Sequence, residues 1–179
     1  MSDYGVITEG TALRFERLLP GPIERVWEYL TDSEKRGTWL ASGPMELRVG
    51  GKVELQFRHA DLSSEKTAPP EFAKYQAGVT QKGVVTRCEP PRVLSYTWGS
   101  DDSDNGAEVT FELSPRDAGK VLLVITHRRL GDRRARVMAA GGWHAHLGVL
   151  EDRLAGTEPR PFWSRFMKFR DDYETSIPQ

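Results

Sequence analysis

The sequence predicts a single α+β domain in which a curved antiparallel β-sheet wraps around a long C-terminal helix. Up to about residue 127, apolar and polar residues mostly alternate with the period of strands, whereas the pattern after Gly131 has the period of a helix. The apolar face of such a sheet must be covered, and the long helix is the available cover. A chain of 179 residues is long enough to build one domain around one core.

Composition narrows the functional classes. The 25 basic and 26 acidic residues nearly cancel, so we expect neither a nucleic acid nor a membrane surface as partner. Cys88 is the only cysteine, which rules out an internal disulfide and a cysteine-based zinc site and makes the cytoplasm the expected location. The N-terminus does not resemble a signal peptide, and the longest aliphatic run, residues 121–125, is too short to cross a bilayer.

The first elements expected are one strand and a small helical hairpin. Residues 13–18 alternate with a period of two, and Pro20-Gly21-Pro22 ends the strand. In the helix that follows, apolar residues recur at i, i+3, i+4 and i+7, so they share one face. They are Ile23, Val26, Trp27 and Leu30. A second, shorter helical turn is expected between Ser33 and Trp39.

A meander of about six strands should come next. The expected strands are residues 45–49, 53–57, 84–89, 93–98, 109–113 and 121–127. Gly50-Gly51 would turn the first of these into the second as a hairpin. Residues 60–75 are polar and show neither period, which predicts a long mobile loop of a kind that often forms a lid. An acidic turn is expected at residues 100–106.

Two helices should end the chain. The first carries an apolar stripe and ends at Gly156, a natural C-terminal stop. Its stripe consists of Trp143, Leu147, Leu150 and Leu154. The second carries an aromatic stripe that is too apolar to stand free in water. That stripe consists of Phe162, Trp163, Phe166, Phe169 and Tyr173. It either packs on the parent domain or forms a homodimer contact.

Several of these segments together resemble a known family. The segments are Pro22 to Asp32, Thr126 to Leu130, Gly142 to Leu147 and Leu150 to Gly156. They resemble the START-like (SRPBCC) superfamily, in the branch similar to activators of the heat-shock-protein-90 ATPase. The resemblance implies the helix-grip fold, with one domain over residues 1–179, a core over 12–156 and an aromatic helical extension over 159–176. Similar proteins bind hydrophobic ligands, act as cyclases on polyketide-like substrates or assist chaperones, so the resemblance leaves the function open.

In such a fold, inward strand residues and the near face of the long helix would line a ligand cavity. The expected lining residues are Trp39, Phe57, Tyr96, Trp98, Phe111, Ile125, His127, Trp143 and Leu147. The alternative is that these large side chains fill the space as a solid core. Gly141-Gly142 favours a cavity, because two glycines inside a helix are unfavourable unless a strand, a bend or a ligand comes close.

Catalytic and metal sites receive little support. The sequence contains no nucleophile elbow, glycine-rich nucleotide loop or phosphate loop, so we expect no cofactor. His144 and His146 lie about 200° apart on a helix and cannot share one metal ion. His127 continues an apolar strand face and, with Tyr96, is a weak candidate for proton transfer.

Five arginines gather around the expected start of the long helix. They are Arg128, Arg129, Arg133, Arg134 and Arg136. Such a patch is either solvated and ion-paired, or it binds an acidic group. Aromatic residues do not interleave with it, which disfavours nucleic acid.

The leading functional hypothesis is a non-catalytic protein that binds a small hydrophobic molecule between the sheet and the Trp143 helix. A cyclase or hydratase acting on a polyketide-like or aromatic substrate, with His127 or Tyr96 moving protons, is the first alternative. A chaperone-associated adaptor that uses the outer sheet or the aromatic tail is the second.

Overall fold

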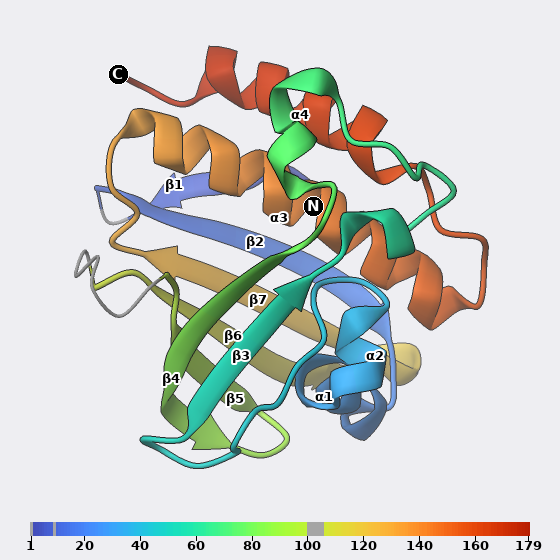
Figure 1. Ribbon diagram of the computed structural model, residues 1–179. Coiled ribbons are helices and arrows are strands. Elements are labelled where there is room, and N and C mark those ends of the chain that lie inside the picture. Colours follow the sequence, from blue (N-terminus) through green and yellow to red (C-terminus); the bar gives the residue numbers. More distant parts are fainter. Residues whose placement is uncertain (1, 9, 100–105) are drawn as a thin grey trace.

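The computed structural model describes residues 2–8, 10–99 and 106–179. Figure 1 shows a curved sheet, the long helix α3 lying along it, and α4 on the outer side of α3. The elements are β1 (Val6–Thr8), β2 (Ala12–Pro20), α1 (Ile23–Thr31), α2 (Ser33–Gly37), β3 (Lys52–Phe57), η1 (His59–Asp61), η2 (Pro70–Tyr75), β4 (Val79–Glu89), β5 (Val93–Thr97), β6 (Glu108–Arg116), η3 (Asp117–Gly119), β7 (Lys120–Arg128), α3 (Arg133–Ala155) and α4 (Phe162–Ser176).

Within the described part of the chain, seven strands form one antiparallel sheet in the order β1-β2-β7-β6-β5-β4-β3. The pairing of β2 with β7 places Leu13 opposite His127 and Pro20 opposite Lys120, so the early strand lies beside the last one. The chain then runs from β7 into α3, which covers the apolar face of the sheet. The predicted helix-grip fold, with its small helical hairpin and its extra C-terminal helix, is therefore confirmed.

The long helix begins and ends where the sequence predicts. The Asp132 carboxylate caps α3 by accepting a hydrogen bond from the Ala135 amide at 2.9 Å. At the other end, Gly156 has a φ of +70°, the left-handed conformation that commonly ends a helix. These two residues fix which stretch of α3 lies over the sheet.

α4 packs its aromatic stripe against the rest of the chain. All five stripe side chains are buried, and α4 lies along α3. The close approach uses Gly141, where an added Cβ atom would lie 3.1 Å from the backbone nitrogen of Arg170. The stripe thus packs on the parent domain, and a homodimer contact through α4 would have to use its other face.

The prediction of a strand at residues 45–49 is wrong. This segment makes only isolated bridges, Ser42 with Gln56 and Met45 with Val53, and then forms a turn. Leu47 and Val49 are 44% and 67% exposed, so their alternation with polar residues did not reflect a buried face. β3 pairs instead with β4, and β1, which the sequence analysis did not predict, is the seventh strand.

The predicted loop over residues 60–75 is more ordered than expected, because it contains η2 and the end of η1. Its buried residues include Leu62 and Phe72, and Ser63 Oγ accepts a hydrogen bond from the backbone amide of Phe162 at 3.0 Å. The segment is therefore attached to α4. β4 begins at Val79, five residues earlier than the predicted 84, and most of the predicted acidic turn lies outside the described residues. None of the helices in the described residues is long and apolar enough to span a membrane.

Candidate functional site

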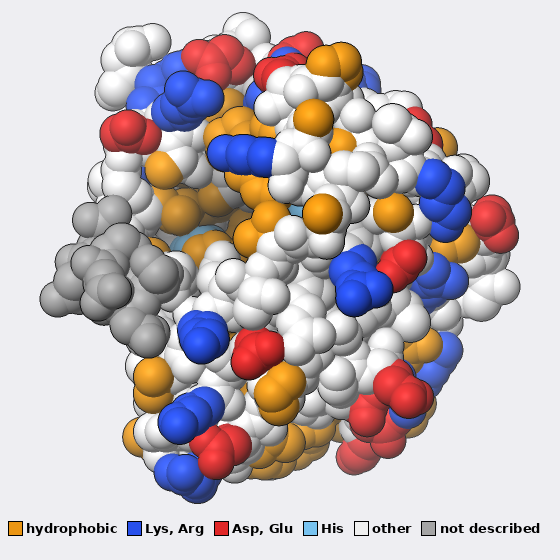
Figure 2. Space-filling view, viewed as in Figure 1, with side chains coloured by type: hydrophobic (Ala, Val, Ile, Leu, Met, Phe, Trp, Pro, Cys, Tyr) orange, Lys and Arg blue, Asp and Glu red, His pale blue; other side chains and the backbone are white. Residues whose placement is uncertain are grey.

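A cavity of about 420 Å³ lies between the sheet, the N-terminal half of α3 and the start of α4. Figure 2 shows a hollow on the viewed face, with hydrophobic side chains gathered in its depth and histidine visible among them. The sheet and the residue that follows β5 contribute one wall, which contains both apolar and polar side chains. Its side chains are Phe57, Val79, Gln81, Trp98 and His127.

Small residues on α3 leave part of the space open, although Met138 also lines the cavity from this helix. Ala135, Ala139 and Gly142 line the cavity, and their spacing of i, i+4 and i+7 places them on one helix face. An added Cβ atom at Gly142 would have no neighbour within 4 Å. Trp143 is buried beside this small-residue face, and its ring contacts Trp98 with a centroid separation of 5.2 Å. Small side chains on the helix thus leave room that large rings surround.

The third wall comes from the segment before β4 and from α4. It is mainly aromatic and consists of His59, Phe72, Tyr75, Phe162, Trp163 and Phe166. The rings of Phe72 and Trp163 stack at a centroid distance of 5.8 Å, and the ring of His59 lies 5.0 Å from that of Trp163. This wall therefore depends on contacts between residues almost a hundred positions apart in the chain.

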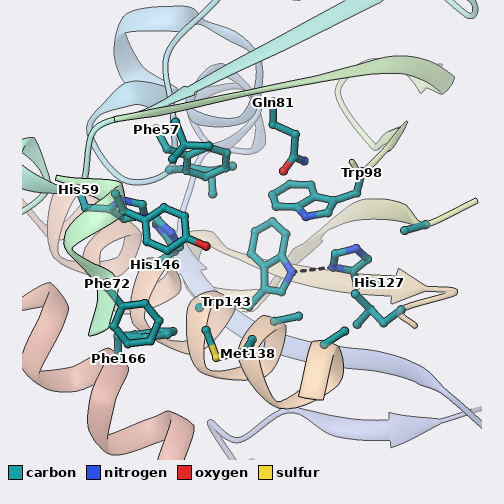
Figure 3. Close-up of a pocket in the computed structure, with 18 of the residues that line it drawn as sticks. Phe57, His59, Phe72, Gln81, Trp98, His127, Met138, Trp143, His146 and Phe166 are labelled. Atoms are coloured by element: carbon teal, nitrogen blue, oxygen red, sulfur yellow. Dashed lines mark hydrogen bonds between the residues drawn. The ribbon is translucent and has the colours of Figure 1, made fainter. Parts of the chain in front are cut away.

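The central polar contact of the cavity joins His127 and Trp143. Trp143 Nε1 donates a hydrogen bond to His127 Nδ1 at 3.0 Å, as the dashed line in Figure 3 shows. An indole N–H can only donate, so Nδ1 must hold a lone pair, and in the neutral ring the proton lies on Nε2. Burial lowers the pKa of His127 to about 3, which keeps the ring neutral near pH 7. His127 therefore presents a fixed N–H donor at Nε2.

Two other histidines line the cavity. His146 Nδ1 lies 2.7 Å from the carbonyl oxygen of Trp39, so Nδ1 is the protonated nitrogen and Nε2 holds the lone pair. Burial lowers the pKa of His146 to about 3 and that of His59 to about 4. All three cavity imidazoles are thus neutral near pH 7, and among the described lining residues Arg129, which is exposed, carries the only charge.

The nine residues expected to line a cavity fall into two groups. Phe57, Trp98, His127 and Trp143 do line it. The other five do not line it; they are 0–1% exposed and lie in the solid core. They are Trp39, Tyr96, Phe111, Ile125 and Leu147. The second group therefore combines the inward strand residues Tyr96, Phe111 and Ile125 with Trp39 and Leu147 from outside the sheet, and all five belong to the buried core cluster.

Of the two weak catalytic candidates, His127 lines the cavity and Tyr96 lies in the core. Tyr96 does not line the cavity, and burial raises the pKa of its hydroxyl above the ordinary value, so the proton is held firmly. His144 Nδ1 lies 2.9 Å from the Tyr173 hydroxyl oxygen, on the α4 side of α3, whereas His146 faces the cavity, as their helical spacing predicts. The described residues contain no group of three or more His, Cys, Asp or Glu side chains that could hold a metal ion.

Ion pairs occupy part of the arginine patch. Arg133 pairs with Glu174 of α4, and Arg129 Nη2 lies 3.8 Å from Glu108 Oε1. A polar hollow of about 720 Å³ adjoins this region, and charges of both signs line it. The ion-paired alternative therefore accounts for Arg129 and Arg133.

Sequence reasoning missed the third wall of the cavity and the role of Gln81. A signal for that wall was present: the aromatic stripe of α4 had to dock somewhere, and Phe72 and Tyr75 interrupt an otherwise polar segment. The long-range contact between these two segments could not be inferred from either pattern alone. Gln81 lies before the strand that was expected at residues 84–89, so the sequence analysis assigned it to no element, whereas in the structure it belongs to β4.

A helix-grip domain with a mainly apolar, ligand-sized cavity under its long helix defines the class of this protein. The family model described as activator of Hsp90 ATPase homolog 1-like protein matches residues 20–155. The chain belongs to this family. α4 lies beyond the matched residues, so part of the third wall of the cavity is built by a segment that the family model does not include.

Solved structures extend the similarity to almost the whole chain. A protein from Bordetella parapertussis, solved by NMR, is 46% identical, covers 99% of this chain and 92% of its own, and has a TM-score of 0.83. CalU16 from Micromonospora echinospora is 20% identical over 98% and 96% of the two chains, with a TM-score of 0.68. The Aha1 dimer from Colwellia psychrerythraea is 16% identical over 80% and 95%, with a TM-score of 0.60. No curated protein matches the chain.

Proposed function

We propose that this protein binds a small, mainly apolar molecule in the cavity between the sheet and α3. The observation that carries the proposal is the unfilled space of about 420 Å³, walled by aromatic side chains and by the small-residue face of α3. Burying about 300 Å² of ligand surface at roughly 25 cal/mol per Å² would contribute about 7 kcal/mol before the costs of association. That is enough for useful affinity.

Native mass spectrometry of gently purified protein, combined with a panel of lipids and metabolites, tests the proposal. We expect a bound species, and we expect Gly142→Leu to lose it because the new side chain occupies the cavity. Ala155→Leu is the matched control, since it makes a similar change at the exposed end of the same helix. A wild-type protein that is always empty and responds to no compound on the panel contradicts the proposal.

The geometry argues against His127 and Tyr96 as the proton-transferring groups of the cyclase or hydratase alternative. A general base needs a free lone pair, but His127 Nδ1 accepts from Trp143 and His127 Nε2 carries the proton. Tyr96 does not line the cavity. The adaptor alternative loses the aromatic stripe of α4 as a docking surface, because that stripe is buried against the parent domain.

A further inference from the structure

One nitrogen of the cavity residue His127 has no hydrogen-bond partner, and its role as a donor is fixed. His127 is 1% exposed and lies on β7 at the end of the inward face formed by Val121, Leu123 and Ile125. Its Nε2 atom has no hydrogen-bond partner in the described part of the chain. The contact with Trp143 prevents the proton from moving to Nδ1, so Nε2 stays a donor. A buried donor without a partner is unfavourable, which marks this atom as prepared for an acceptor from outside the chain.

A second group of the same kind lies across the cavity. The side-chain nitrogen of Gln81 is also buried without a partner, and Figure 3 shows the Gln81 side chain reaching down toward the Trp98 ring from β4. Trp98 in turn contacts His127, with ring centroids 5.3 Å apart. Two donors without a partner thus flank the Trp98 indole, and both belong to residues that line the cavity.

The charges around the cavity select the kind of acceptor. His59, His127 and His146 are neutral near pH 7 because burial lowers the pKa of each ring. The guanidinium of Arg129, which is the arginine among the described lining residues, is exposed and already contacts the Gly106 carbonyl and the Glu108 carboxylate. A carboxylate placed against His127 would lose its hydration without gaining a buried cation. A neutral oxygen is less costly to dehydrate and accepts the same hydrogen bond.

We propose that the ligand is a neutral carbonyl compound, a ketone, ester or amide that carries aromatic rings, whose oxygen accepts a hydrogen bond from His127 Nε2. The aromatic body would lie among the rings of Trp98, Trp143 and Phe57, all of which line the cavity (Figure 3). The first two of these rings contact the His127 imidazole. The inference rests on the proposed function, since it specifies the chemistry of the molecule that fills the same cavity.

Two matched probes test the hydrogen bond. Benzophenone supplies a neutral carbonyl between two rings, and in its methylidene analogue CH2 replaces the carbonyl oxygen. The ratio of the benzophenone affinity to the analogue affinity, measured by calorimetry, should fall about 5- to 30-fold in His127→Phe relative to wild type. His144→Phe is the control, because it makes the same change at a buried histidine that does not line the cavity, and it should leave the ratio unchanged.

A second measurement needs no substitution at His127. The infrared stretch of the benzophenone carbonyl should shift to lower frequency in the wild-type complex, as a hydrogen bond weakens the C=O bond. In free protein, nitrogen NMR should show a proton on His127 Nε2 and none on Nδ1. A carbonyl band at its apolar-solvent frequency, or a protonated Nδ1, overturns the inference even if His127→Phe does not fold.

Trp143 acts here as a positioning residue, since it fixes the tautomer of His127. In Trp143→Phe the proton is free to move to Nδ1, so Nε2 can also accept. The affinity of benzhydrol, in which a hydroxyl replaces the carbonyl, should therefore rise relative to that of benzophenone. Retained binding of the methylidene analogue shows that the variant still forms the cavity.

The outcomes separate the two proposals. If wild type binds both probes and the ratio does not change in His127→Phe, the carbonyl inference fails while the proposed function stands. If wild type binds neither probe and is empty and unresponsive on the broader panel, the proposed function fails and the inference fails with it.

Discussion

Gly141 and Gly142 are neighbours on α3, yet they face different regions of the molecule. An added Cβ atom at Gly141 meets the backbone of Arg170 at 3.1 Å, whereas one at Gly142 meets nothing within 4 Å. The first glycine allows two helices to touch, and the second leaves a cavity open. The same contrast divides the interior: a solid region around Phe111 and Leu147, and a hollow region around Phe57 and Trp98. Inward aromatic residues occur in both, so the small side chains of α3 decide which region stays empty.

The largest predicted effect compares one aromatic ring from each region. Phe111→Ala should lower the free energy of unfolding by about 3–5 kcal/mol, because it leaves a new void in a filled core. Phe57→Ala should cost about 1.5–3 kcal/mol, because its ring already borders open space and little additional cavity is created. Urea unfolding of both variants measures the difference. Equal costs would mean that the cavity is closed in solution and that the contrast between the regions is wrong.

The next effect comes from the glycine pair. Gly141→Leu should lower the free energy of unfolding by about 1–3 kcal/mol, because the helix backbone of α4 cannot move aside. Gly142→Leu should be neutral or gain up to about 0.5 kcal/mol, since leucine favours helix and meets no neighbour at Cβ. Thermal unfolding distinguishes the two. A strongly destabilised Gly142→Leu variant would show that the space beside this residue is not available.

Much of the fold could be predicted from the sequence because strong local signals agree with it. Pro22 begins α1, Asp132 and Gly156 bound α3, and the four-strand meander from β4 to β7 follows the period of two. The strand at residues 45–49 failed because alternation alone does not show that a neighbouring strand exists. This segment lies beside β3, the edge of the sheet, and pairs with it only at single positions.

The site was harder to predict because its emptiness is a property of opposing surfaces. Tyr96 and Trp98 are two positions apart, so the strand pattern predicts that both point to the same face of the sheet. Only Trp98 lines the cavity, whereas Tyr96 is buried in the core. The informative pattern was the small-residue face of α3, which consists of Ala135, Ala139 and Gly142. Of these, only Gly142 was interpreted from the sequence as favouring a cavity. The third wall depends on contacts between η2 and α4, and no local periodicity encodes such contacts.

Acid pH should test whether the two regions differ in access to water. His127 of the hollow region and His144 of the α3–α4 contact both have their pKa lowered to about 3, from 6.5 when unfolded. Burial is the main cause for each, and Arg17 and Arg165 lower the pKa of His144 further. Because the unfolded chain binds more protons below pH 6.5, each histidine should reduce the free energy of unfolding by up to about 1.4 kcal/mol per pH unit as pH falls.

Urea unfolding at several values between pH 6.5 and pH 5 measures that slope. Replacing either histidine by phenylalanine should reduce this slope by the contribution of about one proton, which is up to about 1.4 kcal/mol per pH unit. If water enters the cavity and lets His127 protonate in the folded state, His127 contributes nothing to the slope, and His127→Phe leaves the slope unchanged. In that case only His144→Phe would change the slope, and His127 would no longer be a fixed donor.

The smallest effect separates the stability of α3 from the shape of the cavity. Asp132→Ala removes the cap that holds the Ala135 amide, at the end of α3 that borders the hollow region, and should cost about 1 kcal/mol. Asp132 does not line the cavity, so benzophenone affinity should stay the same while the unfolding midpoint falls. Asp32→Ala, which removes the corresponding bond to the Lys35 amide in α2, is the control far from this end of α3. If Asp132→Ala alone weakens binding as strongly as Gly142→Leu, the first turn of α3 moves when its cap is lost. The hollow then depends on the rigidity of this turn as well as on the small residues of the helix.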